Sequence, residues 1–247
     1  MEVIRKSIVI ALVLAVIASA AYAHEEDAGV WARLGVLDPV NFLLWSAVVS
    51  SIFIAVSVYY RRHMGGQAKK IAFVLIAVPV IVSTIYTSWS TAYLNVASAT
   101  GGPVHWHADY EVWACGEKHE LIDPTGFENR IGSPTVHEHN DNRIHVEGVL
   151  LQLEDASLHE YFESVGGDFT GSSLTMPTHE GMLTWKDGDF CDGRPARWYV
   201  FVNGNLVRNG HEHIIAPYPT VSPGDEIKMV FTEKPLDEIN TILSEVP

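Results

Sequence analysis

The sequence predicts an α+β protein, in which a transmembrane helical hairpin precedes a mixed β-sheet with one packed helix. Three observations support this fold class. The long apolar runs are confined to residues 1–94. Residues 104–115 alternate between polar and apolar side chains, which is typical of a half-buried strand. The clearest helical apolar stripe outside the long runs begins next to Ser157.

Residues 1–23 have the pattern of a secretory signal peptide. A charged start and an apolar run lead to the small-residue sequence AYA, so cleavage is predicted before His24. An uncleaved anchor helix is the alternative, because the apolar run is only slightly shorter than a membrane span. In either case residues 24–41 would form a segment outside the cytoplasm.

Residues 42–93 are predicted to form the transmembrane hairpin. The runs 42–60 and 71–93 are uncharged and long enough to cross a bilayer, which makes membrane lipid an expected partner. The connector 61–70 carries four basic residues, and the positive-inside rule therefore places it in the cytoplasm. Residues 94–247 would then form an extracytoplasmic domain anchored in the cell membrane, which is the orientation that the signal peptide also predicts.

The predicted extracytoplasmic domain is strongly acidic. Residues 95–247 hold twenty-five acidic and nine basic residues, a net charge of −16 with histidine neutral. Such a surface repels phosphate backbones, which argues against nucleic-acid binding. It would accept cations or the basic patch of another protein, although a salt-adapted host would also produce this composition.

Secondary-structure signals divide this domain into several strands and one helix. The strand at 104–115 turns at Gly116 and is expected to pair with residues 118–122. Residues 123–142 are rich in Pro, Gly, Asn and Asp and are predicted to be a loop. Residues 143–152 return to strand character.

The predicted helix begins with the capping box SLHE at Ser157 and ends at Gly166. Its apolar stripe consists of Leu158, Tyr161, Phe162 and Val165. His159 lies off this stripe and is interpreted as a solvated surface residue. An Asn-Gly pair within residues 197–208 predicts a hairpin, and the turn SPGD leads into a last strand at 226–231.

The segments YVFVNGNLV and VSPGDEIKMVF resemble the end of ubiquitin-like β-grasp domains such as the small sulfur-carrier proteins. This resemblance implies a β-grasp-like sheet with the helix packed across one face. The chain does not end in the Gly-Gly tail that those carriers need, so sulfur-carrier activity is not expected.

Three His-x-His pairs stand out in the acidic domain. On a strand, residues i and i+2 point to the same face, so the two imidazoles of a pair can chelate one ion. His145 adds another imidazole, on the same predicted strand face as Glu147. The predicted metal ligands are His105, His107, His137, His139 and His145, and the further candidates are His211, His213, Asp109, Glu147 and His24.

Imidazoles with neighbouring carboxylates suit zinc or copper, and the extracytoplasmic setting does not choose between these metals. The alternatives to a functional metal site are the solvated face of half-exposed strands, a pH-sensitive contact, or fortuitous capture of a metal ion at the surface without a function. Two cysteines are too few for a thiolate-rich zinc site. Cys115 and Cys191 are expected to form a disulfide because both lie in an exported domain, and the alternative is a thiolate ligand beside the histidines.

The segments GGPVHWHADYEVWACG, GSPTVHEHNDNRIHVEGV and SLHEYFESVGG resemble an uncharacterised, chiefly archaeal family of membrane-anchored proteins. The resemblance covers residues 85–195. It implies no established activity. It does imply that the five predicted metal ligands belong together, because the family motifs contain all five histidines.

A second resemblance concerns His24. If cleavage occurs before it, the mature chain begins with a histidine whose amine and imidazole lie on the same side of the membrane as the His-x-His pairs. This arrangement resembles the copper sites of copper monooxygenases, including the B subunit of methane and ammonia monooxygenases. No cupredoxin-like pattern surrounds His24.

The sequence therefore supports three functions. The first is a membrane-anchored zinc- or copper-binding protein that uses its histidine cluster for metal handling or a structural role. The second is a non-enzymatic accessory or assembly subunit that docks a membrane-complex protein partner through its acidic face. The third is a copper-dependent oxidase or monooxygenase component that uses His24. No GxSxG, P-loop, GxGxxG, HExxH or CxxC motif assigns a catalytic residue, and whether the protein is an enzyme stays open.

Overall fold

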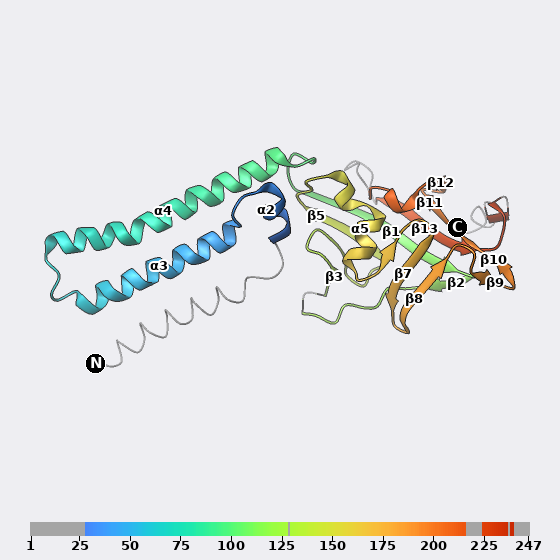
Figure 1. Ribbon diagram of the computed structural model, residues 1–247, viewed down its shortest axis with the longest axis horizontal. Coiled ribbons are helices and arrows are strands. Elements are labelled where there is room, and N and C mark those ends of the chain that lie inside the picture. Colours follow the sequence, from blue (N-terminus) through green and yellow to red (C-terminus); the bar gives the residue numbers. More distant parts are fainter. Residues whose placement is uncertain (1–27, 128, 216–223, 237, 240–247) are drawn as a thin grey trace. The chain divides into compact units, whose positions relative to one another are not determined.

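The computed structural model describes residues 28–127, 129–215, 224–236 and 238–239. The predicted signal peptide, residues 1–23, and the candidate ligand His24 lie outside the described residues. The chain divides into two compact units, residues 1–96 and 97–247 (Figure 1).

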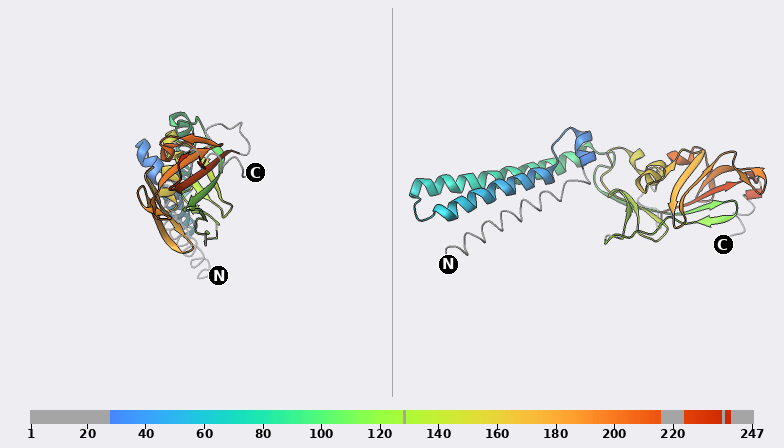
Figure 2. Two further views of the ribbon diagram at one scale, coloured as in Figure 1. Left: turned by 90° about the vertical axis from the view of Figure 1, so that its right-hand side faces the viewer. Right: turned by 60° about the horizontal axis from the view of Figure 1, so that its bottom comes forward.

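The described part of the first unit is helical. Its helices are α2 at Ala28–Leu34, α3 at Pro39–Tyr60 and α4 at Gly66–Ala97. α3 begins where the Asp38 side chain accepts a hydrogen bond from the Val40 amide at 2.8 Å, with Pro39 in the first turn. α3 and α4 run antiparallel and side by side (Figures 1 and 2).

α3 and α4 are long and apolar enough to cross a membrane. Many of their large apolar side chains are exposed, including Trp45 and Phe73. A polar contact joins the two helices where Ser50 Oγ donates to the Ile76 carbonyl at 3.4 Å. Both helices begin earlier than the predicted apolar runs, and α4 continues without a break through Pro79.

A large mixed sheet dominates the second unit. Its strand order is β12-β11-β13-β1-β5-β4-β3, and β2 pairs with β1. β1 and β13 are parallel, whereas the other neighbours are antiparallel, so the predicted α+β class with a mixed sheet is confirmed. The strands are β1 Val104–Ala114, β2 Glu117–His119, β3 Ile131–Gly132, β4 Val136–Glu138, β5 Arg143–Gly148, β11 Arg197–Val202, β12 Asn205–Val207 and β13 Asp225–Thr232.

One face of this sheet forms the hydrophobic core with α5, which spans Leu158–Ser164. Ser157 caps α5 by accepting a hydrogen bond from the Glu160 amide at 3.3 Å. The predicted helical stripe and the even-numbered positions of β1 are buried together: Leu158, Tyr161, Phe162, Val165, Trp106, Ala108, Tyr110, Val112 and Ala114. The odd-numbered side chains of β1 therefore lie on the opposite face of the sheet.

Several predicted boundaries were wrong. Residues 123–142 contain β3 and β4 in addition to loop, because pairing with β5 holds even the three-residue β4 extended. β5 ends at Gly148 instead of residue 152, and the return strand after Gly116 is the short β2. The Asn-Gly hairpin is confirmed, since Asn203 and Gly204 have φ values of 51° and 75° between β11 and β12.

A second sheet and a two-stranded ribbon had no counterpart in the predictions. The sheet consists of β6 Asp168–Phe169, β7 Ser173–Thr178 and β8 Gly181–Lys186, and the ribbon of β9 Phe190–Cys191 and β10 Arg194–Pro195. Two short 3-10 helices, η1 Leu153–Ala156 and η2 Gly210–Glu212, complete the described elements. β7 carries Pro177, which weakens a strand signal in a sequence.

A disulfide between Cys115 and Cys191 ties the turn after β1 to β9. The two Cα atoms lie 5.2 Å apart, and the cysteines are 76 residues apart in the sequence. Closing such a long loop stabilises the fold by about 4–5 kcal/mol in the chain-entropy model. Both cysteines of the chain lie in the described part and neither is free, so the disulfide is confirmed and the thiolate-ligand alternative is wrong.

Candidate metal centre

Two neighbouring strands, β1 and β5, form the framework of the candidate site. In their antiparallel register, His105 faces Glu147 and His107 faces His145. Directly opposed residues project from the same face of a sheet, so a His-x-His pair meets a His-x-Glu pair. The alternate residues point into the core, which fixes the strand faces and therefore the direction of all four side chains.

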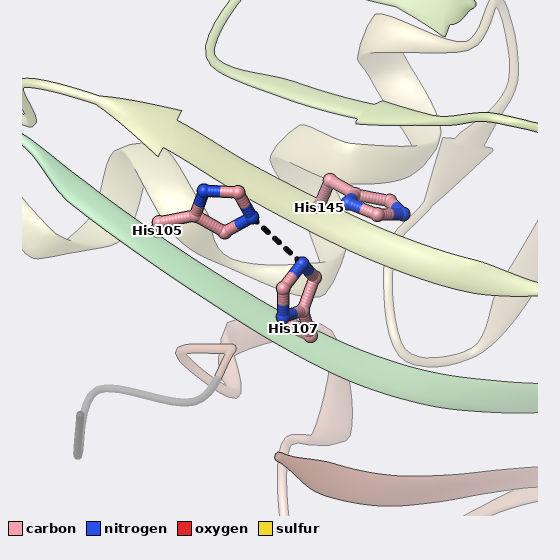
Figure 3. Close-up of side chains that lie close together, drawn as sticks. All are labelled: His105, His107 and His145. Carbon is pink, nitrogen blue, oxygen red and sulfur yellow. Dashed lines mark hydrogen bonds between the residues drawn. The ribbon is translucent and has the colours of Figure 1, made fainter. Parts of the chain in front are cut away.

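The three imidazoles of these strands converge (Figure 3). The Nε2 atoms of His105 and His107 lie 2.9 Å apart, and one nitrogen from each of His105, His107 and His145 lies within 4.8 Å of the others. Two ligands of one ion at metal–nitrogen distances of about 2.0–2.1 Å are about 2.9–3.4 Å apart. The first pair is therefore already at chelating distance.

A carboxylate adjoins this group on the His105 side. Glu147 Oε1 lies 3.4 Å from His105 Nε2. The other candidate carboxylate, Asp109, is engaged by Arg143, whose Nε and Nη2 donate to its two oxygens at 2.6 and 3.1 Å. A bidentate pair of this kind leaves Asp109 poorly placed to bind a metal ion.

The strand β4 brings the second His-x-His pair to the same cluster. His137 stands opposite His145 in the register, and their rings stack at 5.6 Å with an interplanar angle of 6°. The ring of His139 lies 4.7 Å from that of His137 and 4.9 Å from that of His145. Ring contacts thus connect all five predicted histidines across β1, β5 and the end of β4.

Two hydrogen bonds orient rings of this cluster. His145 Nε2 donates to Asp141 Oδ2 at 3.1 Å, which leaves His145 Nδ1 with its lone pair. Asp141 is itself held, because its other carboxylate oxygen accepts from the Arg143 amide at 3.2 Å. His139 Nδ1 donates to the Asn129 carbonyl at 2.7 Å, which leaves His139 Nε2 free to bind. A carboxylate or carbonyl behind an imidazole is typical of metal-binding histidines.

The surroundings of two histidines in the cluster, His107 and His137, favour the neutral ring. Burial lowers the pKa of His137 to about 4, and His139 adds to this effect. Burial also lowers the pKa of His107, with His145 and His105 as further causes. A neutral imidazole is the form that binds metal ions, so at neutral pH His107 and His137 need not first lose the extra proton of an imidazolium. An ion bound by both His105 Nε2 and His107 Nε2 would still replace the proton of the hydrogen bond between them.

The cluster is open at one end and closed at the other. The His105 side chain is 62% exposed and that of Glu147 is 40% exposed. His137 is only 1% exposed, and its Nδ1 has no hydrogen-bond partner among the described residues. An ion bound near His105 would therefore meet solvent, whereas one bound by His137 and the half-buried His139 would be less accessible.

The third His-x-His pair lies elsewhere. His211 in η2 packs against Phe169, with ring centroids 6.1 Å apart. His213 follows η2, and its Nε2 lies 3.0 Å from Asp225 Oδ2. Within the described ranges, neither histidine belongs to a group of three convergent metal-binding side chains.

Three features of the domain could not be predicted from the sequence. Asp141 has no pattern of its own and is marked only by its position four residues before His145. On α5, one ligand atom from each of His159, Glu160 and Glu163 lies within 4.8 Å of the others, so His159 has polar neighbours as well as solvent. A cavity of about 310 Å³ opens on the odd-numbered face of β1 near Trp113, Val230 and Ile239.

Comparisons with known proteins add no assignment, since no family model, no curated protein and no solved structure matches this chain.

Proposed function

We propose that this protein binds a zinc or copper ion through His105, His107 and His145 and handles that ion outside the cytoplasm. The observation that carries the proposal is the convergence of three imidazoles, with the first two Nε2 atoms 2.9 Å apart. Glu147 Oε1, 3.4 Å from His105 Nε2, would add a negative charge beside the ion. Three imidazoles and a carboxylate suit either metal.

The openness of the site favours metal handling over a structural role. Structural zinc sites are closed, with four protein ligands, whereas sites that exchange ligands keep a position open. With His105 62% exposed, a bound ion would keep water within reach. This supports a site from which the ion can leave or at which another molecule can reach it.

The proposed location is the outer side of a membrane. The two long apolar helices and the basic connector between them, which includes Lys69 and Lys70, support a hairpin anchor. The Cys115–Cys191 disulfide supports an oxidising compartment for the domain. A β-grasp identity is part of this proposal, and the parallel pairing of β1 with β13, between β5 and β11, supports it.

The other two functions have less support. Docking of a membrane-complex partner rests on net charge alone. A copper monooxygenase centre requires His24, which lies outside the described residues.

Metal analysis of the full chain, purified in detergent, tests the proposal. The chain is loaded with zinc or copper, freed of excess ion, and analysed for metal per chain. We expect at least one equivalent in the wild type and the loss of one equivalent in His105→Ala/His107→Ala. His211→Ala/His213→Ala is the matched control, because it also removes a His-x-His pair but should leave the metal content unchanged. An equal metal content in the two double variants would contradict the proposal.

A further inference from the structure

We propose that the histidine cluster holds two metal ions instead of one. The outer site consists of His105, His107 and His145, and the inner site consists of His137 and His139. This inference rests on the proposed function, because it concerns the same cluster. It adds a second ion of the same ligand class at the buried end.

A buried ring nitrogen of His137 supports the inner site. His137 is 1% exposed, and its Nδ1 has no partner among the residues that the structure describes. The residue opposite it on β3 is Gly132, which brings no side-chain polar atom to that nitrogen. A buried polar atom without a partner costs free energy, so native proteins supply a partner such as an ion or a buried water.

The geometry of His137 and His139 also supports the inner site. The rings of His137 and His139 lie 4.7 Å apart, and those of His105 and His107 lie 4.6 Å apart. The two His-x-His pairs thus present their imidazoles at the same spacing. His139 is held by Asn129 on both sides: its Nδ1 donates to the Asn129 carbonyl at 2.7 Å, and its own carbonyl accepts from Asn129 Nδ2 at 3.0 Å. His139 Nε2 is therefore presented by an oriented ring.

The orientation of the rings excludes a single ion bound by all five histidines. An imidazole binds a metal ion with a lone pair that lies in the plane of its ring. The rings of His137 and His145 are stacked with an angle of 6° and a centroid distance of 5.6 Å, so each offers the other its face. In addition, His145 Nε2 is occupied by Asp141. His145 is left to the outer group, and His137 is left to the inner pair.

The two sites would differ in access. The outer site has a 62% exposed ligand in His105, whereas the inner site has a 1% exposed ligand in His137. We therefore expect the inner ion to exchange with a chelator more slowly than the outer ion. The cluster would then retain the inner ion while the outer ion exchanges.

The experiment is a titration of the full chain in detergent with Cu²⁺ as the probe. Bound copper per chain is measured after removal of excess ion, and the electron paramagnetic resonance spectrum is recorded at each step. We expect two equivalents in the wild type, with dipolar broadening of the spectrum only when the second equivalent binds. His139→Ala should retain one equivalent without broadening, and His105→Ala/His107→Ala should also retain one.

His139→Ala is preferred to a change at His137 because the latter is buried in the sheet. His179→Ala, which removes an exposed histidine that is paired with Asp123 at 3.4 Å, is the control and should keep both ions. Binding of one ion that either variant abolishes would mean a single five-histidine site and overturn the inference. Binding of one ion that only the outer variant abolishes would leave the inner nitrogen to a buried water and also overturn it. A wild type that binds no copper in this titration and no zinc in the metal analysis of the loaded chain would instead refute the proposed function itself.

Discussion

The two ends of the histidine cluster have the same sequence motif and different surroundings. His105 and His107 stand on the central strand β1, on a face that is open to solvent, whereas His137 belongs to the short strand β4 and is almost fully buried. Their ring spacings are nearly equal, at 4.6 and 4.7 Å. The spacing of the motif on an extended chain thus sets the distance between two imidazoles, and the neighbouring strands set their access to water and their pKa.

A substitution at Gly132, next to the buried end of the cluster, should cause the largest loss of stability. Gly132 has a φ of 115°, and a Cβ there would lie 2.6 Å from the Val136 carbonyl oxygen. Backbone strain and this clash should make Gly132→Ala cost about 4 kcal/mol of unfolding free energy. Urea unfolding measures the loss, and the metal-binding assay should show that the inner ion is lost before the outer one.

Gly181→Ala is the matched control for that change. Gly181 has the same φ of 115°, but a Cβ added there meets nothing within 4 Å. Its cost should therefore be the backbone strain alone, about 1–3 kcal/mol. Equal losses in the two variants would contradict the close approach of β3 to His137.

Acid should destabilise the metal-free chain through the buried end. The pKa of His137 is lowered from 6.5 to about 4, so between these values the unfolded chain binds a proton that the folded chain does not. The stabilisation is complete above pH 6.5 and is lost as the pH falls to about 4, which amounts to about 3 kcal/mol. Urea unfolding at pH 7 and pH 4 measures it.

The variant His137→Leu separates this effect from other acid-sensitive groups. It should show a smaller difference in unfolding free energy between the two pH values than the wild type. His179→Leu, at an exposed position, should keep the wild-type difference. If His137→Leu also kept it, the buried ring would not be the source of the acid sensitivity.

A third change tests the orientation of the outer site. Asp141 accepts a hydrogen bond from His145 Nε2 at 3.1 Å, and its loss should free the ring to turn. We expect Asp141→Asn to weaken binding at the outer site by about 10–100-fold, as is usual when the partner of a metal-binding histidine is removed. Competition with a chelator measures the affinity. Asp123→Asn, at the exposed contact with His179, is the control, and equal affinities of the two variants would argue against an orienting role.

The open end of the cluster could be predicted from the sequence and the buried end could not. β1 alternates cleanly because one of its faces is buried, so Trp106 and Tyr110 indicate that His105 and His107 lie opposite the core. This inference needs only the two-residue period of a strand.

The segment with His137 was predicted to be a loop because it is rich in Pro, Gly and Asn. Its three-residue strand is extended because it pairs with β5, which is a tertiary effect. The turn back into β5 uses Asn140 and Asn142 at φ values of 64° and 54°. Such turns fix the register, and the register decides that His137 stacks on His145. The difference in burial between the two ends of the cluster could therefore not be predicted from the sequence, although the family resemblance suggested that the five histidines belong together.

The smallest expected effect concerns the exposed carboxylate of the outer site. Glu147 Oε1 lies 3.4 Å from His105 Nε2, and both side chains are largely in solvent, where such contacts contribute less than about 1 kcal/mol. Glu147→Gln should therefore weaken outer-site binding by about threefold if Glu147 only attracts the ion. A loss as large as that of Asp141→Asn, measured by the same chelator competition, would mean that Glu147 binds the metal directly. The open end would then hold the ion with four protein ligands, and its difference from the buried pair would be one of coordination as well as of access to water.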